Sequence, residues 1–287
     1  MPTNPARTFG AEFEVGAPVS RREMVRAMQR HGLRATMAEW NGRDFTQWQV
    51  KTDSSVYAHR DGFTPMEIVS PILTWDEAVE QFARLEAAWA EMGGVEVNRT
   101  TGGHVHVHVG DLNHVQVGRV VDTYLRRQRL HTDLAGRPAE GYCDSVAPGS
   151  GAVWVESWEQ DRNPYYNRSA VINPTYYLSR GTLEFRQGAG RAEPARMLAW
   201  VGVLLALIDG TATDTLPRLR HGSSVDDYLT SLVTADLMAE HVAAWMTGDL
   251  SSTTLAEHFG PIAAAAAAEA ARTVREAMPN LFRLQGL

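Results

Sequence analysis

The sequence has a single cysteine, Cys143, among its 287 residues. An intrachain disulfide is therefore impossible, and a zinc site built on several thiolates is excluded. Lysine is equally scarce, because Lys51 is the only one against 26 arginines. Such a bias is typical of a GC-rich coding sequence. The one lysine retained in a polar strand is still a candidate functional residue, because an ammonium is more compact than a guanidinium.

Long apolar runs and nucleotide-binding loops are also missing. The longest apolar run, residues 199–208, is about half of a membrane span. The N-terminal residues lack the apolar core of a signal peptide, so we expect a cytoplasmic protein with no membrane partner. A net charge of −7 disfavours a nucleic-acid partner. The absence of G-x-x-x-x-G-K-[ST] excludes a P-loop, and the absence of G-x-G-x-x-G after a strand disfavours a Rossmann cofactor site.

What the sequence does contain is a run of alternating histidine and valine. Residues 100–109 read TTGGHVHVHV, and strict alternation of apolar and polar residues is the pattern of a half-buried strand. The side chains of His104, His106 and His108 would share one face, with the valines between them in the core. Three imidazoles side by side titrate near neutral pH, which favours a functional role over a purely solvated surface.

Four further segments alternate in the same way and predict strands with one polar face. They are Phe9–Val15, Trp48–Asp53, Met66–Ser70 and Thr182–Gln187. The charged residues on their polar faces are Glu12, Glu14, Lys51, Asp53, Glu67, Glu184 and Arg186. Adjacent carboxylates repel each other by up to about 1 kcal/mol, and a cation between them removes that cost. Oxygen-rich ligand sets suit Mg²⁺ or Mn²⁺ better than Zn²⁺, and paired ions of this kind handle phosphate oxygens.

The order of the predicted elements indicates an α+β fold. Capping boxes at Ser20 and Thr74 predict helices that end near His31 and Met92, and Asp111 or Asn113 begins a third that reaches Leu134. The other expected elements are a strand at 33–38, a long loop at 135–164 with one strand at 152–158, a hairpin of 169–178 with 181–187, and helices at 193–208, 223–247, 251–259 and 261–279. We therefore expect a curved, mainly antiparallel sheet with a polar concave face, helices on its other face, and a helical C-terminal section. The predicted division is a catalytic sheet domain, 1–190, and a helical section, 191–287.

Six segments in this order resemble the amidoligases of the carboxylate–amine ligase superfamily, which includes glutamine synthetase and glutamate–cysteine ligase. They read FGAEFE, KTDSS, EIVSP, GGHVHV, NR and GTLEFR, and span residues 9–187. The resemblance implies ATP-dependent formation of an amide or isopeptide bond between a carboxylate and an amine, carried by small molecules or peptides. It also implies an acyl-phosphate intermediate, and ATP with two or more Mg²⁺ or Mn²⁺ ions in the concave face.

The resemblance further implies roles for single residues. The metal ligands would be Glu12, Glu14, Glu67, His104 and Glu184. The contacts to the nucleotide would come from His106, Arg168, Asn173 and Arg186. Arg186 would also stabilise the transferring phosphoryl group through its fixed fork of donors. Asp53 is a candidate for the base that takes the proton of the amine, and Lys51 is a further catalytic candidate. His108 extends beyond the two histidines of the family and is given no role.

Two other functions remain open on the residues alone. A metal-dependent hydrolase of amide or phosphate bonds could use the His-x-His strand, although the βα repeats of a barrel amidohydrolase are absent. A non-catalytic relative could bind nucleotide or metal on the same fold, although the full set of acids argues against lost turnover. Release of ADP that requires both Mg²⁺ and a mixture of acids and amines would distinguish the ligase from both.

Overall fold

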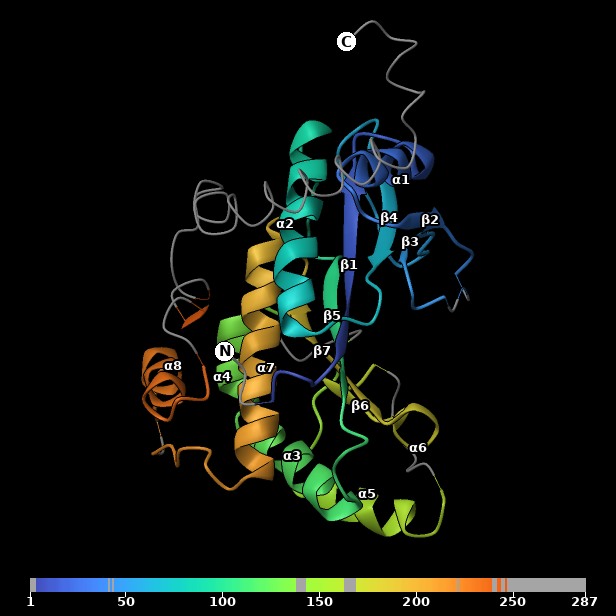
Figure 1. Ribbon diagram of the computed structural model, residues 1–287. Helices are drawn as coiled ribbons and strands as arrows, with labels where there is room; N and C mark the ends of the chain where they lie inside the picture. The colour runs from blue at the N-terminus through green and yellow to red at the C-terminus, as the bar shows by residue number, and fades with distance from the viewer. Residues whose placement is uncertain are drawn as a thin grey trace, which may run out of the picture.

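A seven-stranded sheet forms the middle of the molecule (Figure 1). The structure is a computed structural model that describes residues 4–40, 42, 44–137, 143–162, 169–220, 222–238, 242, 243 and 246. The strands are β1 (Phe9–Ala17), β2 (Ala35–Met37), β3 (Trp48–Lys51), β4 (Thr64–Val69), β5 (Gly102–His108), β6 (Ile172–Asn173) and β7 (Thr182–Ala189). They lie in the order β2-β3-β4-β1-β5-β7-β6, and all neighbours are antiparallel except β2 and β3. The predicted α+β class with a mainly antiparallel sheet is confirmed.

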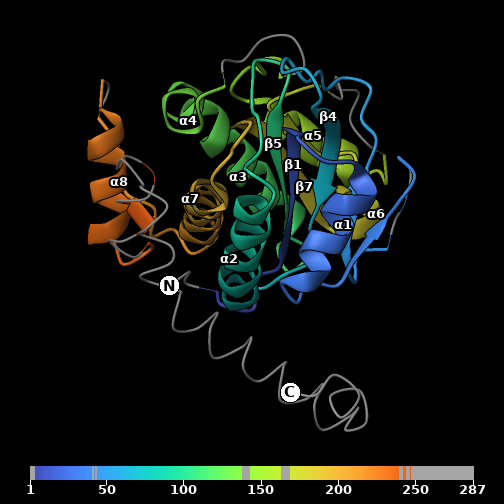
Figure 2. The same ribbon diagram turned by 90° about the horizontal axis from the view of Figure 1, so that it is seen from above.

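The described helices are α1 (Arg21–Arg30), α2 (Trp75–Glu91), α3 (His114–Arg126), α4 (Gln128–Ala135), α5 (Ser150–Trp158), α6 (Tyr177–Arg180), α7 (Pro194–Ala212) and α8 (Val225–Thr234). The predicted capping boxes form at Ser20 and Thr74, and Asn113 caps α3. Helices α2 and α7 lie side by side next to the sheet in both ribbon views (Figures 1 and 2).

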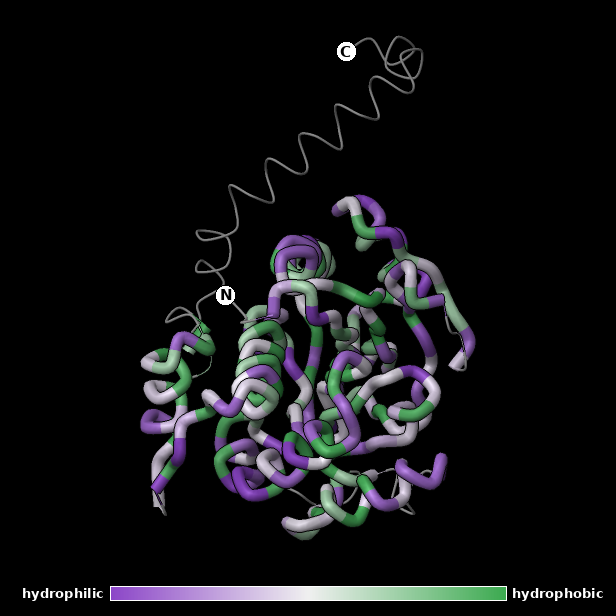
Figure 3. Tube along the Cα trace, turned by 60° about the horizontal axis from the view of Figure 1, so that its bottom comes forward, coloured by the Kyte–Doolittle hydropathy of each residue, from purple (hydrophilic) through white to green (hydrophobic). Residues whose placement is uncertain are grey.

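The alternation of the strands separates a core face from a polar face. The ring of Phe13 on β1 packs edge-on against Phe82 and Trp89 of α2, with ring centroids 5.4 and 5.5 Å apart. Phe185 on β7 packs against Tyr124 of α3 at 5.0 Å. Apolar residues, green in Figure 3, are found along the central strands and along the helices that cover them. The polar residues of the same strands therefore point away from this core.

Helix α7 is, among the described residues, the one helix that is long and apolar enough to cross a membrane. All of its residues except Arg196 and Ala212 are buried in the protein. A helix that is apolar all round is typical of the centre of a large core, and α7 fits that description. It begins just beyond the predicted boundary at residue 190, and the division into two sections stays a prediction.

Two predicted elements between residues 111 and 164 are wrong. The helix expected to reach Leu134 is broken at Arg127, which lets α4 turn so that the His131 ring stacks on Tyr124 with centroids 4.3 Å apart. Residues 150–158 form helix α5 where a strand was expected. Trp154 and Trp158 are buried one helical turn apart, which is a spacing of four rather than two.

The predicted hairpin and the C-terminal helices differ in their extents. The first hairpin strand is only Ile172–Asn173, and the short helix α6 replaces its expected continuation. Gly181, with a φ of 64°, ends α6 and leads into β7. Helix α8 ends at Thr234 rather than at 247. The helices expected at 251–259 and 261–279, and part of the loop at 135–164, lie outside the described residues.

Candidate active site

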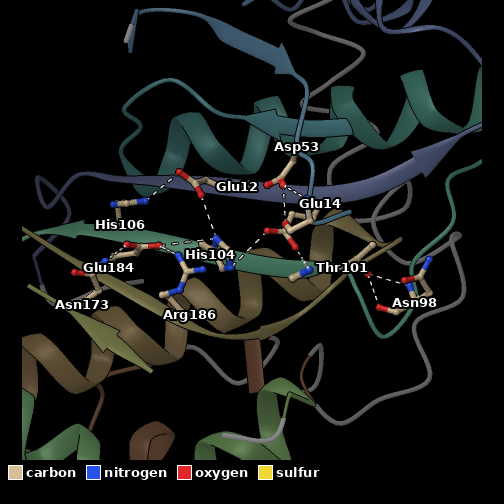
Figure 4. Close-up of polar contacts among 12 residues, drawn as sticks. Glu12, Glu14, Asp53, Asn98, Thr101, His104, His106, Asn173, Glu184 and Arg186 are labelled. Atoms are coloured by element: carbon tan, nitrogen blue, oxygen red, sulfur yellow. Dashed lines mark hydrogen bonds and ion pairs between the residues drawn. The ribbon is translucent and has the colours of Figure 1, made fainter. Parts of the chain in front are cut away.

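Strand register brings the predicted polar residues into two adjoining groups on one face of the sheet. Glu12 on β1 lies opposite His104 on β5. His106, two residues further along β5, lies opposite Glu184 on β7, and Glu184 lies opposite Asn173 on β6. On the other side of β1, Glu14 lies opposite Glu67 of β4, which in turn lies opposite Lys51 of β3. Figure 4 shows these side chains converging from β1, β5 and β7.

The first group, here called the Glu12 cluster, contains Glu12, His104, His106 and Glu184. The two oxygens of Glu12 lie 3.1 Å from Nδ1 of His104 and 3.1 Å from Nε2 of His106. Oε1 of Glu184 lies 3.9 Å from Nδ1 of His104. One donor atom each from Glu12, His106 and Glu184 lie within 4.8 Å of one another. Three converging oxygen and nitrogen donors are a set that a divalent cation can bridge.

Electrostatics favour the charged forms of Glu12 and His106. Burial alone would raise the pKa of Glu12, but the neighbouring His106 and His104 hold this pKa well below its usual range. Burial likewise acts to lower the pKa of His106, and the nearby charge of Glu12 outweighs it, so that the pKa is raised. The carboxylate is therefore ionised at neutral pH and can serve as a ligand.

The second group, here called the Glu14 cluster, contains Glu14, Glu67 and Asp53. Burial raises the pKa of Glu67 well above its usual range, and the negative charges of Glu12, Asp53 and Glu14 add to this against the opposing charge of Lys51. Nε2 of His104 lies 3.8 Å from Oε1 of Glu14. That nitrogen is buried and has no hydrogen-bond partner among the described residues. These acids line one cavity next to the unpaired ring nitrogen, although their ligand atoms do not form a group as close as that of Glu12, His106 and Glu184. A cation bound between Glu14 and this nitrogen would satisfy both.

Arg186 stands between the two groups and faces the same cavity. Its guanidinium forms an ion pair with Glu184 on the same strand, and Asn173 donates a hydrogen bond of 2.6 Å to the other oxygen of Glu184. The charge of Glu184 raises the pKa of Arg186 in spite of the opposing effect of burial, so the side chain stays cationic. Its Nε is buried without a hydrogen-bond partner in the described part of the chain. A ligand oxygen could occupy that donor.

Residues of both groups and Arg186 line a polar cavity of about 130 Å³, whereas His106 and Glu184 of the Glu12 cluster lie outside its lining. It is lined by Glu12, Glu14, Asp53, Ser55, Glu67, Thr100, His104, Arg137 and Arg186. A larger and more open cavity, of about 620 Å³, lies beyond the end of β5 between α3 and α6, and none of the predicted site residues lines it. The small cavity, rather than the large one, is therefore the candidate active site.

The loop that carries Asp53 and Ser55 is hydrogen-bonded to the segment just before β5. Ser55 donates two hydrogen bonds to Oδ1 of Asp53, of 2.7 Å from its backbone nitrogen and 2.6 Å from its hydroxyl. Further along the loop, the backbone nitrogen of His59 donates to Glu96 at 2.9 Å, and Asn98 donates to the carbonyl of Tyr57 at 2.8 Å. The loop is thus held beside the cavity by residues that come just before the histidine strand.

Most of the predicted site residues lie together at the candidate active site, and a few do not. Lys51 is buried opposite Glu67 but does not line the cavity. His108 is exposed at the end of β5, and Arg168 lies outside the described residues. Sequence reasoning assigned no role to Ser55, Thr100 and Arg137. The first two sit in or beside segments already singled out, whereas Arg137 was signalled only by the length of its loop.

Comparison with known proteins defines the class to which this fold and site belong. A family model described as "Putative amidoligase enzyme" matches residues 5–208, which is more than two thirds of the chain. The chain belongs to this amidoligase family. The resemblance drawn from the six sequence segments is therefore confirmed, and the family is one of carboxylate–amine ligases. No curated protein matches the sequence at a significant level.

Three solved structures are similar to the chain at low sequence identity. One is the ligase PafA in complex with the prokaryotic ubiquitin-like protein Pup, at 15% identity and a TM-score of 0.37, with 80% of this chain and 50% of that chain covered. The second is a glutamine synthase homologue, at 14% identity and a TM-score of 0.41, with coverage of 88% and 70%. The third is GmaS with ADP, at 16% identity and a TM-score of 0.41, with coverage of 84% and 67%. This chain thus spans half the length of the PafA chain that it matches.

Proposed function

We propose that the protein is an ATP- and Mg²⁺-dependent carboxylate–amine ligase that works through an acyl phosphate. The observation that carries this proposal is that Glu12, His104, the Glu14 cluster and Arg186 line one small cavity, with His106 and Glu184 adjoining Glu12 and Arg186. Membership of the amidoligase family supports the ligase over a hydrolase built on the same histidines.

The donor atoms fit the metal ions that this chemistry needs. Glu12, His104 or His106, and Glu184 would hold one ion, while Glu14 and Glu67 would hold another. The buried, unpaired Nε2 of His104 and the raised pKa of Glu67 are both features that a cation would relieve. When bound, Mg²⁺ or Mn²⁺ would neutralise the phosphate oxygens of ATP.

The reaction would then proceed in two nucleophilic displacement steps. An oxygen of the acid attacks the γ-phosphorus of ATP, the bond to ADP breaks, and Arg186 stabilises the charge on the transferring phosphoryl group. The amine next attacks the acyl carbon, phosphate leaves, and a base takes the proton of the amine. We assign that role to Asp53, which lines the cavity and has one oxygen fixed by hydrogen bonds from Ser55.

The remaining assignments follow the same division. We assign contacts to the nucleotide to His106 and Asn173, and a supporting charge beside Glu67 to Lys51. Arg168, outside the described residues, stays a predicted nucleotide contact. We further propose that the reacting carboxyl and amine ends of a small-molecule or peptide substrate enter this cavity. We place this activity in the cytoplasm, without a nucleic-acid or membrane partner.

Mg²⁺-dependent ADP release tests the proposal. The protein is incubated with ATP and a mixture of amino acids and amines, and the products are ADP, phosphate and a new amide detected by mass spectrometry. Glu12→Gln should abolish turnover, while Glu91→Gln, an exposed acid on α2, serves as the matched control. Tight ATP binding in EDTA, or activity that requires Zn²⁺ alone, would contradict the proposal.

A further inference from the structure

We infer that Arg137 is a second functional arginine of this site and that it binds the carboxylate of the acid to be activated. The inference rests on the proposed function, since it assigns the substrate end of the same cavity. Arg137 lines that cavity together with Arg186. It follows α4 and belongs to none of the six segments that resemble the family.

The guanidinium of Arg137 has a donor that nothing in the described protein uses. Its Nη1 is buried and has no hydrogen-bond partner among the described residues. Buried donors of charged groups are normally paired, because leaving them unpaired forfeits their solvation. A free cationic donor on the wall of a cavity is explained by an anionic ligand oxygen.

A glycine makes room for this guanidinium beside the metal-binding side chains. A Cβ atom at Gly102 would lie 2.0 Å from Nη1 of Arg137, 3.0 Å from Nε2 of His104 and 3.1 Å from Oε2 of Glu14. The three functional atoms thus surround the space that any side chain at position 102 would fill. Gly102 lets Arg137 approach the Glu14 cluster from the start of β5.

The backbone next to Arg137 is held in place by hydrogen bonds from Arg191 and by a β-bridge to β7. Arg191 donates from Nη2 to the carbonyls of Ala135 at 2.7 Å and Leu134 at 3.4 Å, at the end of α4. Gly136, with a φ of 77°, then bridges to Gly188 on β7. Arg137 is therefore tied to the strand that also carries Glu184 and Arg186.

The position of Arg137 favours the acid over the nucleotide. Arg186 pairs with Glu184 in the Glu12 cluster, whereas Arg137 stands on the Glu14 side of His104. At that side the hydroxyls of Ser55 and Thr100 already donate to Asp53 and Asn98. On this side of His104, the unpaired Nη1 of Arg137 is therefore a cationic donor available to an anion, and the fork of its guanidinium matches a carboxylate.

Chemical labelling of the wild-type protein tests the inference without a variant and without ATP. Methylglyoxal, a small arginine reagent, is applied in sodium acetate or in sodium chloride of equal ionic strength, and peptide mass spectrometry follows each arginine. We expect acetate to slow the labelling of Arg137 several-fold relative to chloride. The exposed Arg22 on α1 is the internal control and should label equally in both salts. Equal labelling of Arg137 in the two salts, or no labelling of it at all, would overturn the inference.

Nucleotide affinity separates the two arginines. Arg137→Gln should leave the Kd for the Mg²⁺ complex of a non-hydrolysable ATP analogue nearly unchanged. Arg186→Gln should weaken it by roughly 10-fold or more, because a charge-assisted hydrogen bond to the γ-phosphate is lost. An equal loss in Arg137→Gln would make Arg137 a phosphate ligand and overturn its assignment to the acid. If the wild-type protein does not bind the Mg²⁺ complex of the analogue, the proposed function fails, and the acetate experiment still decides whether Arg137 binds a carboxylate.

Discussion

His104 occupies the centre of the site because both of its ring nitrogens face carboxylates. Nδ1 lies 3.1 Å from Glu12 and 3.9 Å from Glu184, while Nε2 lies 3.8 Å from Glu14. One imidazole thus joins the Glu12 cluster to the Glu14 cluster. This position explains why a buried histidine is present where an apolar side chain would pack more simply.

Arg186 should matter to the phosphoryl transfer and little to folding. Arg186→Lys keeps a cation beside Glu184, so the thermal midpoint should barely move. The ammonium cannot reproduce the fixed fork of donors, and ATP turnover should fall by roughly 100-fold or more. Turnover and melting are measured on the same preparation, with Arg22→Lys as the surface control. A variant that retains most of its activity would mean that Arg186 is a structural partner of Glu184 only.

His131 should make the protein less stable in mild acid. Burial, together with the charge of Arg127, lowers its pKa to about 3, and its ring stacks on Tyr124 in the core. The unfolded chain therefore binds this proton more readily than the folded one between pH 6.5 and pH 3. Stability from His131 is fully present above pH 6.5 and is lost as the pH falls, by up to about 1.4 kcal/mol per pH unit.

Urea denaturation of wild type and His131→Phe at several pH values between 7 and 4 isolates this effect. The acid groups of the site titrate in both proteins, so the difference between them reports His131. We expect the wild type to lose stability faster than the variant as the pH falls from 6.5. Parallel pH profiles would show that His131 does not carry the acid sensitivity.

At the scale of elements, Arg7 joins the N-terminal segment to the end of β5 and to α7. Its Nε donates to Asp209 of α7 at 2.7 Å, and Nη1 donates to Asp111 and to the carbonyl of His108, both at 2.7 Å. Arg7 and Asp209 are both buried. The network holds the end of the histidine strand against the core helix, which keeps the polar face in register.

Arg7→Ala should therefore destabilise the protein strongly. Removing one partner of a buried ion pair costs about 3–5 kcal/mol, because the other charge remains in the interior. Arg119→Ala is the matched control, because its pair with Asp214 is exposed and should contribute less than about 1 kcal/mol. Chemical denaturation compares the two variants. Similar small losses would mean that solvent reaches Asp209 when Arg7 is absent.

At the scale of the whole molecule, the candidate active site and the hydrophobic core lie on opposite faces of the sheet. One face packs on α2, α3 and α7, and the other presents the two acidic clusters. Burial and, after it, the neighbouring like charges raise the pKa of Glu67, so ionised acids on that face oppose folding in the absence of a cation. Binding of metal and nucleotide on this face should therefore increase the stability of the folded protein.

Mg·ADP should raise the stability of the whole protein. At about 100 times its Kd, a ligand that binds only the folded state contributes about 2.7 kcal/mol. Glu67→Gln should melt at or above the wild-type temperature without ligand, because the buried, ionisable carboxyl is replaced by a neutral amide, and it should gain less from Mg·ADP. Thermal melts with Mg·ADP, with ADP plus EDTA, and without ligand test this. An equal gain in EDTA would remove the metal from nucleotide binding.

The sequence by itself determined which side chains share a face. Alternation along β1, β5 and β7 predicted that the acids, histidines and Arg186 would lie opposite Phe13 and Phe185, because the two-residue period of a strand is a local property. The capping boxes at Ser20 and Thr74 likewise act within four residues, so their helices were predicted to within a residue or two.

Only the tertiary structure decided which of these residues contact one another and which further residues line the site with them. Strand register set Glu12 against His104 and Glu14 against Glu67, and register depends on contacts between segments far apart in the chain. Packing of Trp154 and Trp158 made a helix of the segment predicted as a strand. Arg137 reached the cavity because Arg191 and Gly188 fasten the end of α4 to β7. Neither the strand register nor the anchoring of Arg137 has a local signature, since both depend on contacts between segments far apart in the chain.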